Sequence, residues 1–260
     1  MEYETIRVEK KDGITTVTLN RPEVHNAFNE RVVEELEHCF REEGESDSRA
    51  VILTGTGKSF CAGADLGWMK SMATYSHEEN IEDSREMSNM FEAIYHCPKP
   101  VIGRINGSAF GGGVGLVAVC DYVVSDPGAI FSFSEVKLGI APAVISPYVL
   151  QKVPPGKARY LFISGERFGP EAAHTLGLVD DIAPLEDMGE VIDKKLRILH
   201  SSGPMAVRRN KELVHRITGM PYEEAREYTI RLIAELRTSP EGQEGIGAFL
   251  EKRKPEWSVK

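Results

Sequence analysis

Alternating apolar and polar residues predict a β-hairpin at the start of the chain. Apolar residues are interleaved with threonines over residues 14–19, and residues 6–8 alternate apolar and polar on the other side of an Asp-Gly pair, a common turn sequence. Residues 29–43 show the three- and four-residue spacing of a helix, with Asn29 placed to cap it. A hairpin followed by a helix therefore begins the predicted fold.

Strands and helices then alternate through the middle of the chain. The predicted strands cover residues 50–54, 100–105, 122–124 and 130–133, and the predicted helices cover residues 78–96 and 111–120. The first of these strands is mostly apolar, which is typical of a strand covered on both faces. Alternation of this kind predicts an α/β domain.

The strand pattern fades after about residue 145, and helical patterns dominate the rest of the chain. The predicted helices cover residues 188–199, 205–217, 222–236 and 242–252. Prolines near two of the helix starts fit this prediction, because proline is tolerated in the first turn of a helix. We therefore expect a sheet-containing core domain over residues 1–190 and a helical C-terminal region over residues 191–260.

Composition narrows the choice of partners and compartment. The chain has 260 residues, 41% of them hydrophobic, and a formal net charge of −9, which disfavours nucleic-acid binding. Its four cysteines form no CxxC pair, so no metal site is predicted. The N-terminus is acidic and polar, and no apolar run approaches the ~20 residues of a membrane span. We expect a cytoplasmic protein with reduced thiols and no membrane partner.

Three short segments carry the candidate chemistry. Residues 61–66 and 106–113 are rich in small residues and can each present backbone N–H groups, and Glu135 adds a carboxyl group in an apolar stretch. Two convergent N–H donors form an oxyanion hole, and a carboxyl group beside it can move protons. Taken alone, the triple glycine at 111–113 favours a turn or a tight helix–strand contact, but its place after a strand and its pairing with residues 61–66 favour the donor role. A phosphate loop is disfavoured, because Ile52 stands where its first glycine belongs.

In this order, and together with residues 20–29 and 249–255, the segments resemble the crotonase family, also called the enoyl-CoA hydratase/isomerase family. The resemblance spans nearly the whole chain. It implies an α/β fold of the crotonase type, a spiral of ββα units followed by a C-terminal helical trimerisation region. It also implies a homotrimer, often doubled to a hexamer.

The resemblance assigns the catalytic roles to three residues. The backbone N–H groups of Ala64 and Gly112 match the family's two oxyanion donors, and Glu135 matches a family acid–base residue. A side chain at position 112 would hold the thioester oxygen away from its donor. Burial of Glu135 would raise its pKa, whereas the alternative is a surface pair with Lys137.

One position departs from the family pattern. Many hydratases of the family carry a second glutamate where this chain has Gly115. This glycine would leave room for a branched or carboxylate-bearing acyl group. Residues 140–148 depart from the usual glycine-rich form, and with residues 65–69 and 113–116 they resemble bacterial methylglutaconyl-CoA hydratases of branched-chain acyl-CoA degradation. Trp68 and Met69 fit either pocket walls or the core.

The family's coenzyme A contacts can also be carried over. Those beside the donor loop fall on Ala27, Ala62, Ala64, Asp65, Leu66 and Gly67. Phe249 and Lys252 match residues that reach the ligand of a neighbouring subunit, although Lys252 also fits a solvated helix end. Coenzyme A would enter as part of the acyl-CoA substrate, so no separate cofactor is expected. Asp65 and Asp121 would fix loops through side-chain-to-backbone hydrogen bonds.

The leading hypothesis from the sequence is an enoyl-CoA hydratase that acts on a short or branched 2-enoyl-CoA in fatty-acid metabolism. The alternative is an enoyl-CoA isomerase in which Glu135 alone shuttles the proton. A hydrolase or another lyase on the same scaffold is a third reading. An RNA-binding role, which the family's animal methylglutaconyl-CoA hydratases also show, is disfavoured by the acidic charge and the lack of a basic–aromatic stripe.

Overall fold

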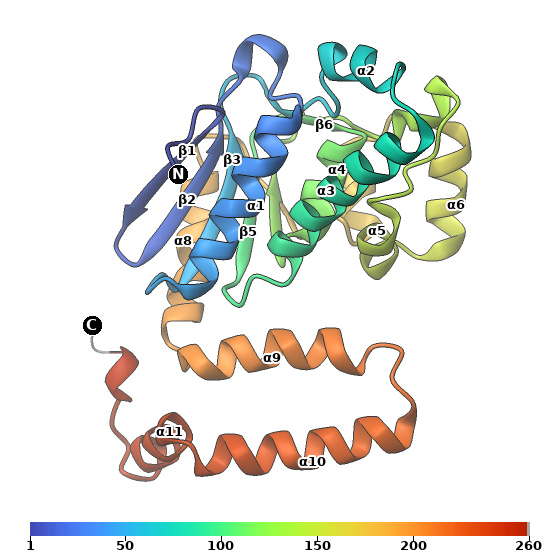
Figure 1. Cartoon of the computed structure of the whole chain (residues 1–260). Helices are drawn as coiled ribbons and strands as arrows, with labels where there is room; N and C mark the ends of the chain where they lie inside the picture. Colours follow the sequence, from blue (N-terminus) through green and yellow to red (C-terminus); the bar gives the residue numbers. More distant parts are fainter. Residues whose placement is uncertain (259–260) are drawn as a thin grey trace.

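The computed structural model of the chain describes residues 1–258. Six strands form a large sheet in the order β1-β2-β3-β5-β7-β9 (Figure 1). These strands are β1 (Ile6–Lys11), β2 (Ile14–Leu19), β3 (Ala50–Gly55), β5 (Val101–Ile105), β7 (Tyr122–Ser125) and β9 (Asp181–Ile182). β1 and β2 pair antiparallel and all other neighbours pair parallel. The hairpin predicted from the alternating pattern is confirmed.

A second, smaller sheet contains three parallel strands in the order β4-β6-β8. They are β4 (Ser59–Cys61), β6 (Ser108–Phe110) and β8 (Phe131–Ser132). The sequence pattern predicted the last of these but missed β4 and β6. Strands of three residues are too short to show a period, so the hydrophobic pattern could not reveal them.

Each turn of the chain passes from the large sheet to the small sheet and then into helices. β3 and β4 lead to α2 and α3, β5 and β6 lead to α4, and β7 and β8 lead to α5, α6 and α7. The helices of this part are α1 (Glu30–Glu45), α2 (Leu66–Met72), α3 (His77–Tyr95), α4 (Gly112–Val119), α5 (Ser146–Lys152), α6 (Pro155–Ser164) and α7 (Pro170–Thr175). The chain is therefore a mixed α/β spiral of ββα turns, as expected.

The hydrophobic core lies between the large sheet and helices α1, α3 and α4. Asn29 caps α1 as predicted, since its side chain accepts a hydrogen bond from the Val32 N–H at 3.0 Å. A smaller cluster covers another part of the sheet, where Met188 and Ile192 of α8 (Met188–His200) pack with Ile102 and Val124. Helix α8 therefore belongs to the packing of the sheet although it crosses residue 190, and the division there remains a prediction.

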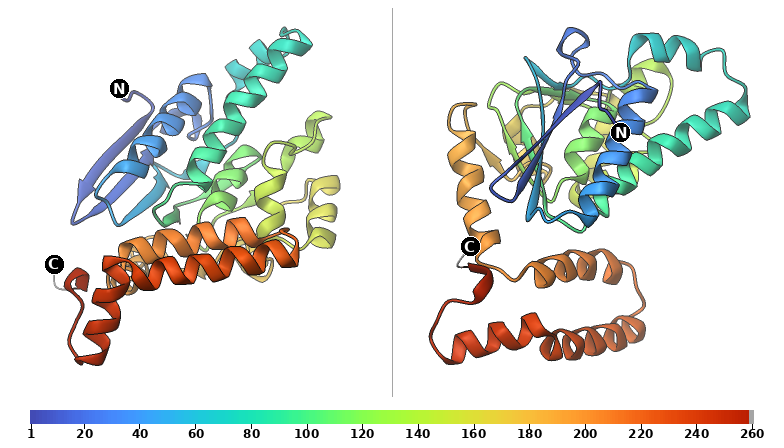
Figure 2. Two further views of the ribbon diagram at one scale, coloured as in Figure 1. Left: turned by 60° about the horizontal axis from the view of Figure 1, so that its bottom comes forward. Right: turned by 60° about the vertical axis from the view of Figure 1, so that its left-hand side comes forward.

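Three helices extend away from the sheets at the C-terminal end (Figure 2). They are α9 (Pro204–Ile217), α10 (Tyr222–Thr238) and α11 (Pro240–Leu250). Helices α9 and α10 run alongside each other, and α11 lies near the end of the chain (Figures 1 and 2). Within residues 1–258, no helix combines the length and the apolar character that a membrane crossing requires.

Candidate active site

The three predicted catalytic residues follow the ends of three adjacent parallel strands. Ala64 lies three residues after β4, Gly112 two residues after β6, and Glu135 three residues after β8. Because parallel strands end at the same edge of a sheet, their following loops meet there. This edge lies near α2 and β6 at the top of Figure 1. The small sheet thus brings together residues that are far apart in the sequence.

The segment around Ala64 is held in a short parallel bridge with Phe28. The Phe28 N–H donates to the Gly63 carbonyl and the Asp65 N–H donates to the Phe28 carbonyl, both at 2.7 Å. Within residues 1–258, the Ala64 N–H between these bonds has no protein acceptor. The bridge therefore fixes the Ala64 segment while leaving its donor available to a ligand.

An ion pair between Arg21 and Asp65 also holds this segment in place. Arg21 donates through Nη1 to the Ala27 carbonyl at 2.7 Å and through Nη2 to Asp65 Oδ2 at 3.0 Å. Asp65 also caps α2, since its Oδ1 accepts from the Gly67 N–H at 2.7 Å, as predicted for a loop-fixing side chain. Burial acts to raise the pKa of Asp65, but these donors outweigh it and the pKa is lowered.

Gly112 is the first residue of α4, where backbone N–H groups have no partner within the helix and the helix dipole is positive. The preceding Gly111 has φ 51°, a left-handed conformation that favours glycine. A methyl carbon built at Gly112 would lie 2.6 Å from Cε2 of Phe28. Glycine is thus required at 112 by the Phe28 ring, whereas the sequence argument attributed it only to access for the thioester oxygen.

Glu135 lies in a short 3-10 helix over Ser134–Leu138 and points toward the start of α4. Its Oε1 is 3.2 Å from the place that a β-carbon at Gly111 would occupy. Its Oε2 is buried and has no hydrogen-bond partner among the described residues. Burial raises the pKa of Glu135, as expected, and no ion pair with Lys137 forms within residues 1–258. The carboxyl group therefore lies beside the Gly112 donor and is poised to bind a proton.

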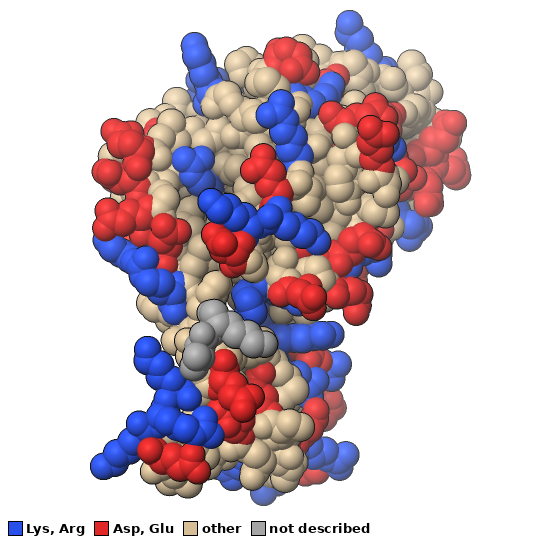
Figure 3. All heavy atoms as spheres, turned by 90° about the vertical axis from the view of Figure 1, so that its left-hand side faces the viewer, with Lys and Arg blue, Asp and Glu red and all other residues tan. Residues whose placement is uncertain are grey.

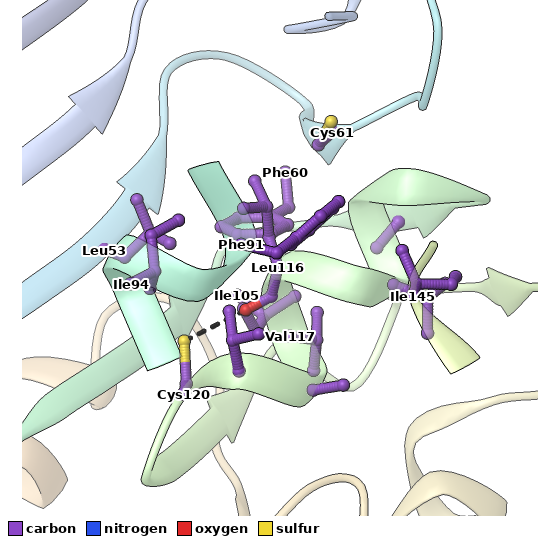
Figure 4. Close-up of a cluster of buried hydrophobic side chains, with 14 of the residues drawn as sticks. Leu53, Phe60, Cys61, Phe91, Ile94, Ile105, Leu116, Val117, Cys120 and Ile145 are labelled. Carbon is purple, nitrogen blue, oxygen red and sulfur yellow. Dashed lines mark hydrogen bonds between the residues drawn. The ribbon is translucent and has the colours of Figure 1, made fainter. Parts of the chain in front are cut away.

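The room expected beside Gly115 is not there. A β-carbon at Gly115 would lie 2.3 Å from Cγ2 of Ile145 and 2.9 Å from Cε1 of Phe91. Both side chains are buried in the main core cluster, which Figure 4 shows around α4. The expectation that this glycine makes space for a larger acyl group is wrong, because residues distant in the sequence fill that space.

The other predicted contact residues divide into two groups. Ala27, Ala62, Leu66 and Gly67 surround the Ala64 segment, with Ala27 buried and Leu66 exposed. Phe249 and Lys252 lie at or just beyond the end of α11, away from α2 at the other end of the molecule (Figure 1). One copy of the chain therefore does not bring them to the donor loops.

Two further residues of this region were left undecided or missed by the sequence analysis. Trp68 is a core residue, since it is buried and its Nε1 donates to Asp83 Oδ1 at 3.0 Å. Phe28 was missed, although its backbone holds the Ala64 segment and its ring touches Gly112. No local signal marks it, because its role comes from contacts made after folding. Within residues 1–258, no cluster of three or more His, Cys, Asp or Glu side chains is placed to hold a metal ion.

Two available backbone donors beside a buried carboxyl group, on a spiral of ββα turns, are typical of enzymes that stabilise an oxyanion and move a proton. Comparison with known proteins agrees with this class. The family model described as "Enoyl-CoA hydratase/isomerase" matches residues 9–260. The chain belongs to this family, the crotonase family that its motifs resemble.

Individual relatives are similar over their whole length. A short-chain-enoyl-CoA hydratase of Clostridium acetobutylicum is 31% identical over 259 residues, which is 98% of each protein. Among solved structures, an enoyl-CoA hydratase from Shewanella pealeana is 33% identical with a TM-score of 0.95, covering 98% of this chain and 97% of that one. AtuE of Pseudomonas aeruginosa is 30% identical with a TM-score of 0.95, covering 98% of this chain and 100% of that one. The fold is therefore that of the crotonase family.

Proposed function

We propose that this protein is an enoyl-CoA hydratase that adds water to the double bond of a short or branched 2-enoyl-CoA. The observation that carries the proposal is the buried Glu135 Oε2, unpartnered among the described residues, on a carboxyl group packed against Gly111, next to the Gly112 donor. Full-length similarity to enzymes named as enoyl-CoA hydratases supports it.

In the proposed reaction, the thioester oxygen accepts hydrogen bonds from the N–H groups of Ala64 and Gly112. The ionised Glu135 takes a proton from water while the water oxygen bonds to the β-carbon. Electrons of the double bond move toward the thioester oxygen, where the two donors stabilise the enolate. Glu135 then returns its proton to the α-carbon, so one carboxyl group serves both steps.

The substrate's coenzyme A part would lie against Ala27, Ala62, Asp65, Leu66 and Gly67, and no separate cofactor is needed. Phe249 and Lys252 of a neighbouring subunit would complete the site in a homotrimer or hexamer. Exposed apolar side chains on the C-terminal helices, among them Phe249 at 83% exposure, support such an assembly. Light scattering of the purified protein measures the assembly directly. The cytoplasmic location also remains a prediction.

3-Methylglutaconyl-CoA is the branched substrate to test first. Its support is the resemblance of residues 140–148, together with residues 65–69 and 113–116, to bacterial methylglutaconyl-CoA hydratases. Gly115 gives no room for a branched acyl group, since Ile145 and Phe91 fill the space beside it. Hydration rates with this ester and with crotonyl-CoA would decide between a branched and a straight acyl group.

An isomerase is the second candidate, favoured by one observation. The position of the family's second glutamate is Gly115, and its surroundings are apolar side chains, so Glu135 acts without a second carboxyl group there. A single carboxyl group suffices to move a proton between the α- and γ-carbons. Loss of enoyl absorbance with crotonyl-CoA would identify the hydratase, whereas gain of absorbance with a 3-enoyl-CoA would identify the isomerase.

The decisive test of the site is Glu135→Gln, which keeps the shape of the side chain but removes its base. Turnover should fall by about 10²–10⁴-fold while binding of a saturated acyl-CoA persists. Glu186→Gln is the matched control, because Glu186 is an exposed loop residue. Near-normal turnover in Glu135→Gln would overturn the role given to this residue.

A further inference from the structure

At the start of α4, a carboxyl group lies beside Gly111, and an apolar wall formed by Ile145 and Phe91 lies beside Gly115. Gly111 is the N-cap residue of α4, and its carbonyl accepts the Gly115 N–H at 3.3 Å, so Gly115 lies one turn into the helix from it. The β-carbon direction of Gly111 leads to Glu135, and that of Gly115 leads to Ile145 and Phe91. Ile145 and Phe91 therefore contact α4 one turn after the position at which Glu135 lies beside the chain.

This wall is firmly packed. Ile145 is 2% exposed and Phe91 is fully buried. The Phe91 ring packs edge-on against the Phe28 ring with the centroids 6.3 Å apart. It also packs at a tilt against the Tyr148 ring, with those centroids 5.9 Å apart. Ile145 is β-branched, which restricts its χ1 angle, and it directly precedes α5. Figure 4 shows Phe91 and Ile145 contributing to the cluster around α4 from two other parts of the chain. The wall cannot yield to a ligand without disturbing several packed rings.

We infer that Ile145, backed by Phe91, is the residue that limits the length of the acyl group, an inference that rests on the proposed function. Of the predicted coenzyme A contacts, Leu66 and Gly67 are exposed, so an acyl chain held by the two donors would run from them inward past Glu135. The side chain that packs against α4 one turn further in, at Gly115, is Ile145. The site therefore favours short acyl groups over longer ones.

The inference predicts a change of substrate ranking in Ile145→Ala. Removing three carbons from the wall should raise the ratio of kcat/KM for 2-hexenoyl-CoA to that for crotonyl-CoA by about tenfold or more, since one methylene group in an apolar pocket is worth about 10–200-fold. Adding Gly115→Ala to this variant places a methyl group in the space that Ile145 vacates and moves the Phe91 ring, which would otherwise lie 2.9 Å from it. The double variant should therefore return toward the ranking of the unchanged protein.

Leu36→Ala is the matched control. Leu36 is fully buried in α1, and the substitution removes the same number of carbons from a different part of the core. It should lower stability without changing the substrate ranking. If Ile145→Ala fails to fold, Ile145→Val should change the ratio in the same direction by a smaller factor.

The outcomes separate this inference from the proposed function. Suppose that the unchanged protein hydrates crotonyl-CoA but a folded Ile145 variant shows the same ratio of kcat/KM for 2-hexenoyl-CoA to that for crotonyl-CoA. The role given to Ile145 is then overturned, and the proposed function stands. If the unchanged protein hydrates no 2-enoyl-CoA, the function fails. In that case calorimetric binding of butyryl-CoA and hexanoyl-CoA tests Ile145 alone. Tighter hexanoyl-CoA binding by Ile145→Ala would support the inference, and an unchanged preference would overturn it.

Discussion

At the scale of a single residue, the burial that suits Glu135 to proton transfer also lowers the stability of the fold when Glu135 is ionised. Its Oε2 is buried and has no hydrogen-bond donor among the described residues, so burial disfavours the ionised form and raises the pKa. The folded chain therefore holds the Glu135 proton more tightly than the unfolded chain does. As the pH rises from the ordinary glutamate pKa through the raised pKa of the folded chain, ionisation of Glu135 lowers the free energy of unfolding.

Glu135→Gln should consequently make the protein more stable at neutral pH. The amide carries no charge, so the gain in unfolding free energy should be small in acid, grow as the pH rises from the ordinary glutamate pKa through the raised one, and stay constant above it. Urea unfolding of both proteins between pH 4 and pH 8 measures this difference. In the same pH interval, activity of the unchanged protein should fall as the pH is lowered. A variant that is less stable at every pH would contradict this account.

Gly112→Ala should disturb the oxyanion donor through the Phe28 ring. The added methyl group would lie 2.6 Å from Phe28 Cε2, so either the ring or the start of α4 must move. Loss of one such donor typically lowers kcat by about 10²–10³-fold. Adding Phe28→Leu should restore part of the activity by removing the obstructing ring atoms.

Gly189→Ala provides the control for this experiment. Gly189 lies in α8, and a β-carbon there would meet no atom within 4 Å. The Gly189→Ala substitution should leave kcat unchanged. Equal kcat values for Gly112→Ala and the unchanged protein would show that Gly112 is not a donor in the reaction.

At the scale of elements, a buried carboxylate ties the N-terminal strand to α1. Glu35 is fully buried, and its Oε2 accepts hydrogen bonds from the backbone of Thr5 at 2.9 Å and from its hydroxyl group at 2.6 Å. Its Oε1 accepts from the Glu4 N–H at 2.8 Å and pairs with Arg31 at 2.8 Å. Burial acts to raise the pKa of Glu35, but these donors outweigh burial and the pKa is lowered.

Glu35→Gln should therefore destabilise the fold. Hydrogen bonds to charged groups contribute about 1.5–3 kcal/mol, and the amide cannot accept from all of these donors at once. Because the folded pKa of Glu35 is lowered, its contribution is present above the ordinary glutamate pKa and is lost as the pH falls through the folded value. Urea unfolding at pH 7 should show the loss.

Glu34→Gln is a closely matched control for this variant. Glu34 is the neighbouring residue of α1 and also pairs with Arg31, but its side chain is 55% exposed. An exposed pair of this kind contributes at most about 1 kcal/mol. A loss of stability in Glu34→Gln as large as that in Glu35→Gln would show that burial is not the cause.

At the scale of the whole molecule, polar contacts and a stacked pair of rings join the C-terminal helices to the core. His215 of α9 stacks on Tyr95 of α3 with the ring centroids 4.1 Å apart. A cleft of about 1030 Å³ separates α9 and α10 from the ends of α1 and α3. Lys211 of α9 donates to Asp121 Oδ2 at 2.6 Å and to the Lys99 carbonyl at 3.2 Å. Arg49 donates to the Ser202 carbonyl at 2.7 Å where the chain leaves α8. On the face shown in Figure 3, acidic and basic side chains occur on both parts of the molecule.

Lys211→Met should loosen this connection without unfolding the core. The Lys211 side chain is only 10% exposed, so its pair with Asp121 is better shielded than a surface pair, and its loss should cost on the order of 1 kcal/mol. Hydrogen exchange should become faster in residues 201–217 and stay unchanged in α1. Lys194→Met, which removes the exposed pair with Glu190 within α8, is the control and should leave hydrogen exchange unchanged in both residues 201–217 and α1. Unchanged exchange in α9 would contradict the role of Lys211.

The sequence by itself determined the elements whose own pattern repeats. Helices α1 and α3 and the first hairpin are long enough for their apolar period to appear, and the Asn29 cap follows from local chemistry. The order of the motifs also sufficed to identify the family. These features depend on residues that are close together along the chain, so the sequence displays them directly.

Only the tertiary structure decided how the candidate site is assembled. The strands β4 and β6 are too short to show a pattern, yet their pairing with β8 brings Ala64, Gly112 and Glu135 to one edge. The sequence suggested an empty space at Gly115, whereas Ile145 arrives there from a later part of the chain and fills it. The physical reason is that the space around a residue depends on which distant side chains fold against it, and no local pattern records that packing.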